Sequence, residues 1–260
     1  MVPSEVHSPK SVANLNYGPP TTDYRTKNWR VLIEEGLTAC AQMARDVDLS
    51  QDGRQRVRFF LWDPPAISLG WKQPRPGWLS QARWRASGVE LVERPTGGGI
   101  AFHGSDVSVA IVIPRAGAIS LEMVMRTVSQ SAARLCQSYG VETSSLVDGQ
   151  GAKRITYCLT QESPYALFIG TQKVAGFALR RYPGSWLVQG SVFVRPLPAS
   201  VAHAIPSDVA DQLKRRAVAL SEAASSLVDE RDVARRWAKH WTLWWKEALS
   251  LRAQGSGLGA

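Results

Sequence analysis

The sequence predicts an α/β (α+β) domain with a mixed, mostly antiparallel central sheet flanked by helices. Two observations support this prediction: three strand-like segments follow one another between residues 165 and 194, and amphipathic helical patterns stand before and after them. The chain has 260 residues, of which 44% are hydrophobic, so it can bury one large core. It contains no GxGxxG or GxxxxGK segment, which would indicate a Rossmann or P-loop nucleotide site.

The chain is basic, with 31 Lys and Arg against 22 Asp and Glu and a formal net charge of +9. A partner with negative potential is therefore expected. Nucleic acid fits poorly, because the basic residues are scattered and accompany no zinc finger, basic zipper or RNA-recognition motif. An acidic protein surface is as good a partner. No run approaches the roughly 18 apolar residues of a membrane span, and the polar N-terminus lacks a signal-peptide pattern, so we expect a cytoplasmic protein without nucleic-acid or membrane partners.

The three cysteines, Cys40, Cys136 and Cys158, are odd in number and far apart in the sequence. They lack the paired spacing of a zinc site or of a disulfide framework. We therefore expect reduced thiols and no metal site.

The N-terminal part is expected to be disordered over residues 1–27, and the tail over 253–260, because both are polar and lack hydrophobic periodicity. From Asn28, apolar residues at spacings of three and four predict a helix with Cys40 on its buried face. The residues of this stripe are Leu37, Cys40, Ala41, Ala44 and Val47.

The next segments favour strands at 57–62 and 66–71, separated by Pro64 and Pro65. A loop and a short helix then lead to a strand at 89–92. After a glycine-rich segment, strand periodicity returns and ends at Pro114; it alternates Val107, Val109, Ile111 and Ile113 with Ser108 and Ala110.

A long amphipathic helix is predicted between Ser120, its N-cap, and Gly140, just past its end. Strands follow at 165–169, 173–180 and 186–194, the first two joined as a hairpin across 170–172. Beyond Pro198 the chain turns helical. Residues 226–252 form an amphipathic helix that packs on the body rather than on a membrane, and its stripe is Val233, Trp237, Trp241, Trp244 and Ala248.

Three consecutive glycines, Gly97, Gly98 and Gly99, follow Arg94-Pro95-Thr96 between two predicted strands. Three glycines are costly in backbone entropy for a plain turn, so they indicate close approach of the backbone to a ligand. Their N–H groups could face a phosphate, a carboxylate or an acyl carbonyl, with the charge of Arg94 beside them. A flexible loop is the alternative. His103 follows on the same connection, as a donor in that site or as a surface histidine.

Lys173 opens a strand of otherwise apolar and small residues, so its ammonium could line a cavity, although a solvated lysine beside a turn is the commoner arrangement. Cys158 lies outside any helical stripe, and most free cysteines are small buried hydrophobes. If the hairpin brings Lys173 back toward Cys158, the ammonium favours the thiolate, and the two would form a nucleophile with its base.

Three blocks together resemble one family. Ser68-Leu69-Gly70, the segment from Arg94 to His103, and Lys173-Val174-Ala175-Gly176-Phe177-Ala178, in this order and spacing, are similar to the catalytic domain of biotin/lipoate protein ligases, and the lipoate branch is nearer. The resemblance covers residues 28–225 and implies that family's mostly antiparallel sheet flanked by helices. Its members attach lipoyl or octanoyl groups to one lysine of a lipoyl domain or of the glycine cleavage H protein. The resemblance implies that Lys173 contacts the acyl carbonyl and that a substrate-binding set is formed by Arg94, Thr96, Gly97, Gly98, Gly99, His103, Gly176, Ala178 and Gly190.

Two chemistries occur in this family: ligases activate a free acid with ATP and Mg²⁺, whereas octanoyltransferases take the acyl group from acyl carrier protein through a cysteine thioester. The segment from Cys158 to Tyr165 is similar to the one that holds the nucleophile in cysteine-dependent octanoyltransferases, and the short helical tail is smaller than the accessory domain of single-chain ligases. The resemblance therefore favours an octanoyltransferase without a cofactor, with Cys158 and Lys173 as catalytic residues. Its donor would be acyl carrier protein and its acceptor an acidic lipoyl domain or the glycine cleavage H protein.

The alternatives are an ATP-dependent lipoate ligase or the large half of a two-chain ligase, a non-catalytic lipoyl-protein binding relative, and, with less support, a biotin ligase. Several positions depart from the family pattern. Glu93 replaces a second arginine, and Gly104 replaces an aspartate, which disfavours Mg-ATP chemistry. Gln189 stands where a histidine is common, and Phe177 is bulkier than the usual residue and would shorten the pocket.

Overall fold

The computed structural model describes residues 22–25, 29–79, 86–115, 120–145 and 155–241. Within these ranges the main element is an eight-stranded sheet in the order β1-β2-β3-β7-β11-β10-β9-β8. Only β2 and β3 are parallel neighbours, so the predicted mixed, mostly antiparallel sheet is confirmed. Its strands are β1 (Thr22–Arg25), β2 (Arg30–Glu34), β3 (Arg56–Phe60), β7 (Asp106–Pro114), β8 (Ser144–Ser145), β9 (Leu167–Ile169), β10 (Gln172–Arg181) and β11 (Ser185–Phe193).

A second sheet of three strands has the order β5-β4-β6, with β4 parallel to β5 and antiparallel to β6. It comprises β4 (Ala66–Leu69), β5 (Glu90–Glu93) and β6 (Ala101–Phe102). The labelled helices are α1 (Ala39–Gln51), α3 (Leu121–Gln137), α4 (Ala199–Ala204), α5 (Ser207–Arg216) and α6 (Leu220–Ala223).

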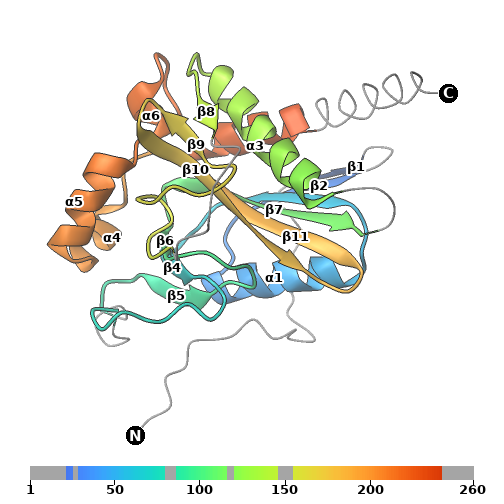
Figure 1. The fold of residues 1–260 in the computed structure, drawn as a ribbon, viewed down its shortest axis with the longest axis horizontal. Helices are drawn as coiled ribbons and strands as arrows, with labels where there is room; N and C mark the ends of the chain where they lie inside the picture. The colour runs from blue at the N-terminus through green and yellow to red at the C-terminus, as the bar shows by residue number, and fades with distance from the viewer. Residues whose placement is uncertain (1–21, 26–28, 80–85, 116–119, 146–154, 242–260) are drawn as a thin grey trace, which may run out of the picture.

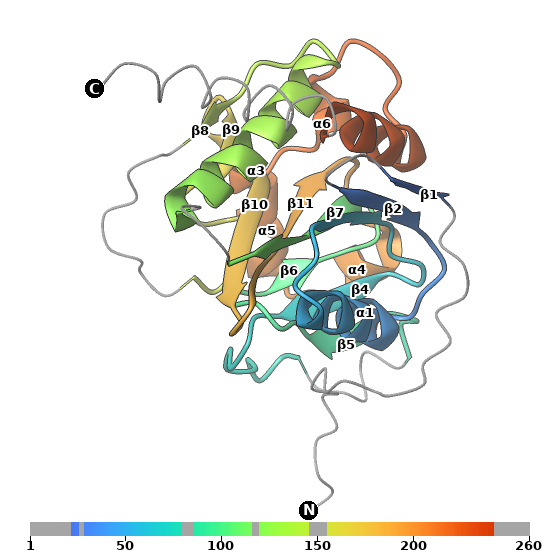
Figure 2. The same ribbon diagram turned by 90° about the vertical axis from the view of Figure 1, so that its right-hand side faces the viewer.

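The large sheet is covered on both faces, and β7 shows how. Val107, Val109, Ile111 and Ile113 belong to the core that contains α3, whereas Ala110 and Val112 pack with residues of α1. Successive side chains of a strand point to opposite faces, so a central strand covered on both sides is apolar on both. Figures 1 and 2 show α3 on one side of the large sheet and α1 with the small sheet on the other.

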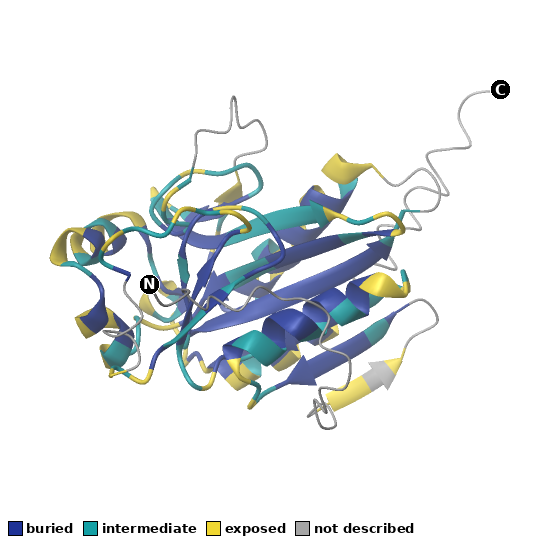
Figure 3. Ribbon diagram, turned by 90° about the horizontal axis from the view of Figure 1, so that it is seen from below, coloured by how far each residue is buried: buried dark blue, intermediate teal, exposed yellow. Residues whose placement is uncertain are grey.

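The small sheet has its own apolar cluster, which includes Ile67, Ile100 and Phe102 from its neighbourhood and Val209 and Leu213 from α5. Exposed residues lie mainly on the outer helices, the turns and β1, as Figure 3 shows. Among the described residues, no helix has the length and apolar character needed to cross a bilayer.

Two local predictions are confirmed closely. Helix α3 begins after Ser120, whose hydroxyl accepts a hydrogen bond from the Met123 N–H at 3.2 Å, and ends before Gly140, which has a φ of +75°. Strands β9 and β10 form the expected hairpin, in which Gly170 takes a φ of +58°. A positive φ is the conformation that favours glycine in such turns.

The prediction of a helix from Asn28 is wrong at its start, because residues 30–34 form β2, which pairs in parallel with β3. The helix begins only at Ala39, after the N-cap Thr38. Cys40 is therefore half-buried rather than on the buried face, and polar Gln42 and Asp46 lie on that face instead. Residues 22–25, inside the segment expected to be disordered, form β1.

The C-terminal helix is present over residues 230–241, and its Trp237 and Trp241 are fully buried against the core that contains α3. Trp241 packs edge-on against Trp29, with ring centroids 5.1 Å apart. The remaining stripe residues, Trp244 and Ala248, lie outside the described residues, as does most of the short helix expected before Gly88. Packing of this helix on the body is thus observed for its described part.

Candidate active site

The glycine loop connects β5 to β6 and is fitted tightly between two other backbone segments. A Cβ atom on Gly70, at the end of β4, would lie 2.0 Å from the carbonyl oxygen of Gly98, and one on Gly99 would lie 2.6 Å from that of Thr156. Gly98 itself has a φ of +94°. The close approach expected of these glycines is therefore made first to the protein's own backbone, and this contact fixes the path of the loop.

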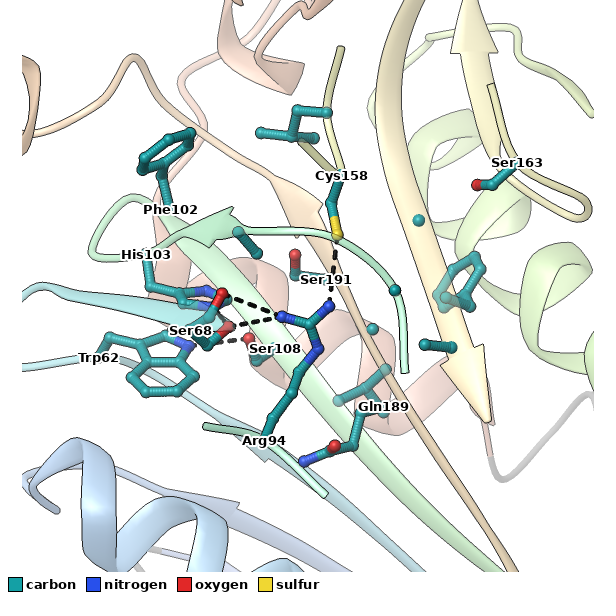
Figure 4. A pocket seen from close by; sticks show the side chains of 18 of the residues that line it. Trp62, Ser68, Arg94, Phe102, His103, Ser108, Cys158, Ser163, Gln189 and Ser191 are labelled. Atoms are coloured by element: carbon teal, nitrogen blue, oxygen red, sulfur yellow. Dashed lines mark hydrogen bonds between the residues drawn. The ribbon is translucent and has the colours of Figure 1, made fainter. Parts of the chain in front are cut away.

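Cys158 is held beside this loop by backbone pairing. The Ile100 N–H donates to the Thr156 carbonyl at 2.7 Å, and the Cys158 N–H donates to the Ile100 carbonyl at 2.8 Å. The thiol is half-buried, and the Arg94 Nη2 donates to its Sγ at 3.4 Å. The sulfur therefore lies directly against the glycine loop and a guanidinium (Figure 4).

Lys173 lies inside the protein, with 2% of its surface exposed. The register of β10 against β9 shifts between Lys173 and Ala175, so a β-bulge turns Lys173 onto the same face as Gly176. A Cβ on Gly176 would lie 3.1 Å from the Lys173 Cε, so the glycine leaves room for this side chain. The expected alternative of a solvated lysine is wrong.

The Lys173 Nζ donates to the Gln161 carbonyl at 2.9 Å and to the Ser163 Oγ at 2.8 Å. Burial lowers the pKa of Lys173 to about 8, although the nearby Cys158 sulfur and Glu162 raise it in part. Lys173 and Cys158 line the same cavity. An amine with this pKa can give and take a proton near neutral pH.

Arg94 is 7% exposed and makes several hydrogen bonds at the base of the cavity. Its Nη1 donates to the Ser68 carbonyl and hydroxyl, and its Nη2 donates to the Gly97 and Gly99 carbonyls as well as to Cys158. Gly97 and Gly99 thus hold the arginine through their carbonyls rather than lining the cavity themselves.

His103 is buried beside Arg94 rather than on the surface. Its Nε2 lies 2.8 Å from the Ser68 Oγ and its Nδ1 lies 2.8 Å from Asp106. The indole of Trp62 stacks on the imidazole with centroids 4.1 Å apart, and its Nε1 donates to the Ser108 Oγ.

Gln189 connects the glycine loop to α1. Its Oε1 accepts from the Thr96 Oγ1 at 2.7 Å, and its Nε2 donates to Asp46 at 2.6 Å. Asp46 in turn pairs with the buried Arg58, which also contacts Glu34. Burial raises the pKa of Asp46, and Arg58 and Gln189 offset this only in part. Thr96 therefore acts on the loop through Gln189 and is not among the residues that line the cavity.

The cavity between the two sheets is lined by apolar residues together with several polar ones. Phe177 packs over Gly190, where a Cβ would lie 2.2 Å from the Phe177 Cδ1. Of the site residues expected from the sequence, the cavity is lined by Arg94, Gly98, His103, Cys158, Lys173, Gly176, Ala178 and Gly190, together with apolar residues such as Phe60, Trp62, Phe102, Val109, Leu159 and Phe177. An apolar chain that carries a reactive carbonyl fits this combination of lining residues.

Sequence reasoning missed three participating residues: Asp106, Ser163 and the hydroxyl of Ser68. Each had a signal. Asp106 follows His103 by three residues, Ser163 lies in the segment quoted for Cys158, and Ser68 lies in the first of the three blocks. None could be assigned a partner before the topology was known.

Known proteins are similar to this chain over most of its length. The family model for the lipoyl protein ligase A/B catalytic domain matches residues 38–242. The octanoyltransferase LipM of Symbiobacterium thermophilum is 31% identical over 182 residues, which cover 64% of this chain and 65% of that protein. The octanoyltransferase LipM of Exiguobacterium sibiricum is 28% identical over 244 residues, which cover 82% of this chain and 85% of that protein.

Two solved structures share the fold. A chain from the structural analysis of an archaeal lipoylation system, comprising a bi-partite lipoate protein ligase and its E2 lipoyl domain from Thermoplasma acidophilum, has a TM-score of 0.63 at 16% identity over 82% of both chains. Lipoate-protein ligase A bound with ATP has a TM-score of 0.62 at 16% identity over 83% of this chain and 85% of that one.

Proposed function

Because the chain belongs to the lipoyl protein ligase A/B catalytic domain family, we propose that it moves an octanoyl group from a carrier protein to a lysine of an acceptor protein in protein lipoylation, through a thioester on Cys158. One observation carries the proposal: Cys158 lines an apolar cavity that also contains the buried Lys173 and Arg94. Neither Cys40 nor Cys136 lines it. The LipM relatives support octanoyl as the acyl group.

In the first half-reaction Cys158 gives its proton to Lys173. A neutral amine has two N–H groups and one lone pair, and the two contacts to Gln161 and Ser163 use both N–H groups. The lone pair is then available to the thiol. The thiolate attacks the carbonyl carbon of the donor thioester, a new C–S bond forms, and the carrier sulfur leaves and takes the proton from Lys173.

In the second half-reaction the amine of the acceptor lysine attacks the carbonyl carbon of the acyl-enzyme. The C–N bond forms, Cys158 leaves as thiolate, and Lys173 accepts the proton that the amine loses. A thioester is converted into an amide, so the transfer runs downhill and needs neither ATP nor Mg²⁺.

The donor is proposed to be acyl carrier protein, and the acceptor a lipoyl domain or the glycine cleavage H protein. A lipoyl-domain acceptor is supported by the Thermoplasma acidophilum neighbour, which is described together with its E2 lipoyl domain. Acidic carriers would be steered by the net charge of +9. We place their docking at the exposed end of α5, because Arg215 and Arg216 line a surface groove with Gln161 and Ile155, and Ile155 also lines the acyl cavity.

The test is to mix the protein with octanoyl-loaded acyl carrier protein, without ATP or acceptor, and to measure intact mass. We expect a gain of one octanoyl group in the wild type and in Cys40→Ser, the matched control, and none in Cys158→Ser. An equal gain in Cys158→Ser would contradict the proposal. If the wild type gains no mass but forms an acyl-adenylate with ATP and lipoate, the protein is a ligase; if it does neither but binds a lipoyl domain, it is a binding protein.

A further inference from the structure

Within the part of the chain that the structure describes, Arg94 is a buried cation without a matching anion. Among the described residues, its hydrogen-bond partners are three carbonyls, one hydroxyl and the Cys158 sulfur, and no carboxylate lies within ion-pair distance of it. Buried charges in proteins are normally paired, because an unpaired one loses its hydration without compensation. The only one of these partners that can itself become an anion is the sulfur.

We propose that Arg94 is a catalytic residue that holds the sulfur of Cys158 as a thiolate, and that Ser68, His103 and Asp106 are the residues that position it. The role in acyl transfer rests on the proposed function, whereas the effect on the thiol itself does not. Arg94 would stabilise the sulfur before it attacks the donor and again when it leaves the acyl-enzyme. A charge-assisted hydrogen bond has the strength needed for this.

The positioning residues form one directed chain of hydrogen bonds. Because the Asp106 carboxylate can only accept, the His103 Nδ1 carries a proton and donates to it at 2.8 Å. In an imidazole with one ring proton the Nε2 is then an acceptor, so the Ser68 O–H donates to it at 2.8 Å while the Ser68 Oγ accepts from the Arg94 Nη1 at 3.0 Å. The Gly104 N–H and the Ser108 hydroxyl fix the carboxylate from the other side.

This chain orients Arg94 from the end opposite to Cys158. Aligned hydrogen bonds polarise one another, so the Asp106 carboxylate acts on the guanidinium through His103 and Ser68 without contacting it. Nη1 is thereby directed toward Ser68, while the carbonyls of the glycine loop direct Nη2 toward the sulfur (Figure 4).

The same three side chains have the spacing of a Ser-His-Asp hydrolase triad, but Ser68 does not act as a nucleophile. Ser68 has no exposed surface, and its hydroxyl oxygen already accepts a hydrogen bond from Arg94. Arg94 contacts both Ser68 and Cys158, and the half-buried Cys158 is the more accessible nucleophile of the two.

The experiment measures the rate at which iodoacetamide alkylates Cys158, followed by peptide mapping to separate it from the other cysteines. At pH 7 we expect Arg94→Ala to lower this rate about tenfold, the size typical of a lost hydrogen bond to a charged group. The difference should vanish above about pH 10, where a thiol is ionised without help. A tenfold loss that persists at high pH would mean altered access and would overturn the proposal, as would an unchanged rate.

Arg180→Ala is the matched control, because Arg180 donates to the Pro95 carbonyl of the same loop but does not contact Cys158. It should alkylate at the wild-type rate. Near-ultraviolet circular dichroism checks that each variant is folded, and Arg94→Lys serves if Arg94→Ala does not fold. Lys keeps the charge but cannot make both sets of contacts, so it should lie between the wild type and Arg94→Ala.

The positioning role is tested with Asp106→Asn, alone and combined with Arg94→Ala. Alone, it should slow alkylation at pH 7 about threefold, and it should have no further effect once Arg94 is absent, because both changes then act on the same interaction. Additive losses would assign Asp106 a structural role only. If the wild type forms no acyl-enzyme but these rates behave as expected, the assignment of Arg94 stands while the proposed transfer fails.

Discussion

Lys173 should reduce the stability of the folded protein at neutral pH in a measurable way. Its pKa falls from 10.5 to about 8 on burial. Below pH 8 the folded protein carries the full cost of a buried ammonium. Between pH 8 and 10.5 the folded state loses this proton while the unfolded state keeps it, so stability rises with pH. The gap between the two pKa values corresponds to about 3 kcal/mol.

The perturbation is Lys173→Met, which keeps the length of the side chain and removes its charge. Urea unfolding at pH 7 and 10.5 should show that the free energy of unfolding of the Lys173 protein, relative to Lys173→Met, rises by about 3 kcal/mol over this range. Comparing the change rather than the absolute values cancels the lost contacts to Gln161 and Ser163 and the titration of other groups. Because the Cys158 sulfur raises the pKa of Lys173, both proteins should also carry Cys158→Ala, which widens the effect. Parallel pH dependences in the two proteins would refute the reasoning.

Three further outcomes follow from the geometry. Gly70→Ala should reduce acyl-enzyme formation at least tenfold, because the added Cβ would meet the Gly98 carbonyl. Gly77→Ala is the control and should leave the rate unchanged, because a Cβ there would have no atom within 4 Å. Equal rates in the two variants would show that the loop tolerates displacement. Phe177→Ala should lengthen the cavity, and in a competition assay it should shift the preference from the octanoyl-loaded to the dodecanoyl-loaded carrier. Leu179→Ala should leave this preference unchanged, because Leu179 lies two residues further along the strand and does not line the cavity. The double change Arg215→Glu and Arg216→Glu should raise the KM for the carrier about tenfold at low salt and flatten its salt dependence. Arg25→Glu with Arg54→Glu, both exposed and near the opposite edge of the large sheet, is the control; the same rise there would indicate non-specific attraction.

The elements found from the sequence are those whose signals are local. Helix α3 has its N-cap, its stripe and its final glycine within about twenty residues, and the β9–β10 hairpin is specified by its turn. The segment at 30–34 has no such signal. Its short apolar run fits a helix or a buried strand equally, and pairing with β3, more than twenty residues further on, decides the outcome.

The buried face of α1 was mistaken for a related reason. Hydrophobic periodicity locates a stripe of apolar residues, but Gln42 and Asp46 are buried because they bond to Leu61 and Arg58 in other elements. Cys40 was placed on that face because it is apolar, and it lies half out of it. Polar groups that are buried through partners elsewhere in the chain cannot be assigned from periodicity.

The candidate site was found in part, because each of its sequence blocks is contiguous and can be recognised by itself. The contacts between the blocks join residues far apart in the sequence. The resemblance pointed to Cys158 and Lys173, but their common cavity depends on the bulge in β10 and on the pairing of Ile100 with Tyr157. Neither feature leaves a pattern in the residues. Asp106 was missed because its strand was recognised only from the alternation that begins at Val107.

The buried charges are of two kinds: paired charges that hold elements together, and unpaired charges that line the cavity. Near α1, Arg58 is paired with Glu34 and Asp46, and these ion pairs hold the helix to the sheet. In the cavity, Arg94 and Lys173 have no carboxylate within ion-pair distance among the described residues, and both lie near the one sulfur. Two unpaired cations beside a single thiol stabilise a negative charge on its sulfur in the free protein, during attack on the donor and after release of the acyl group. A site built for stability alone would have neutralised them.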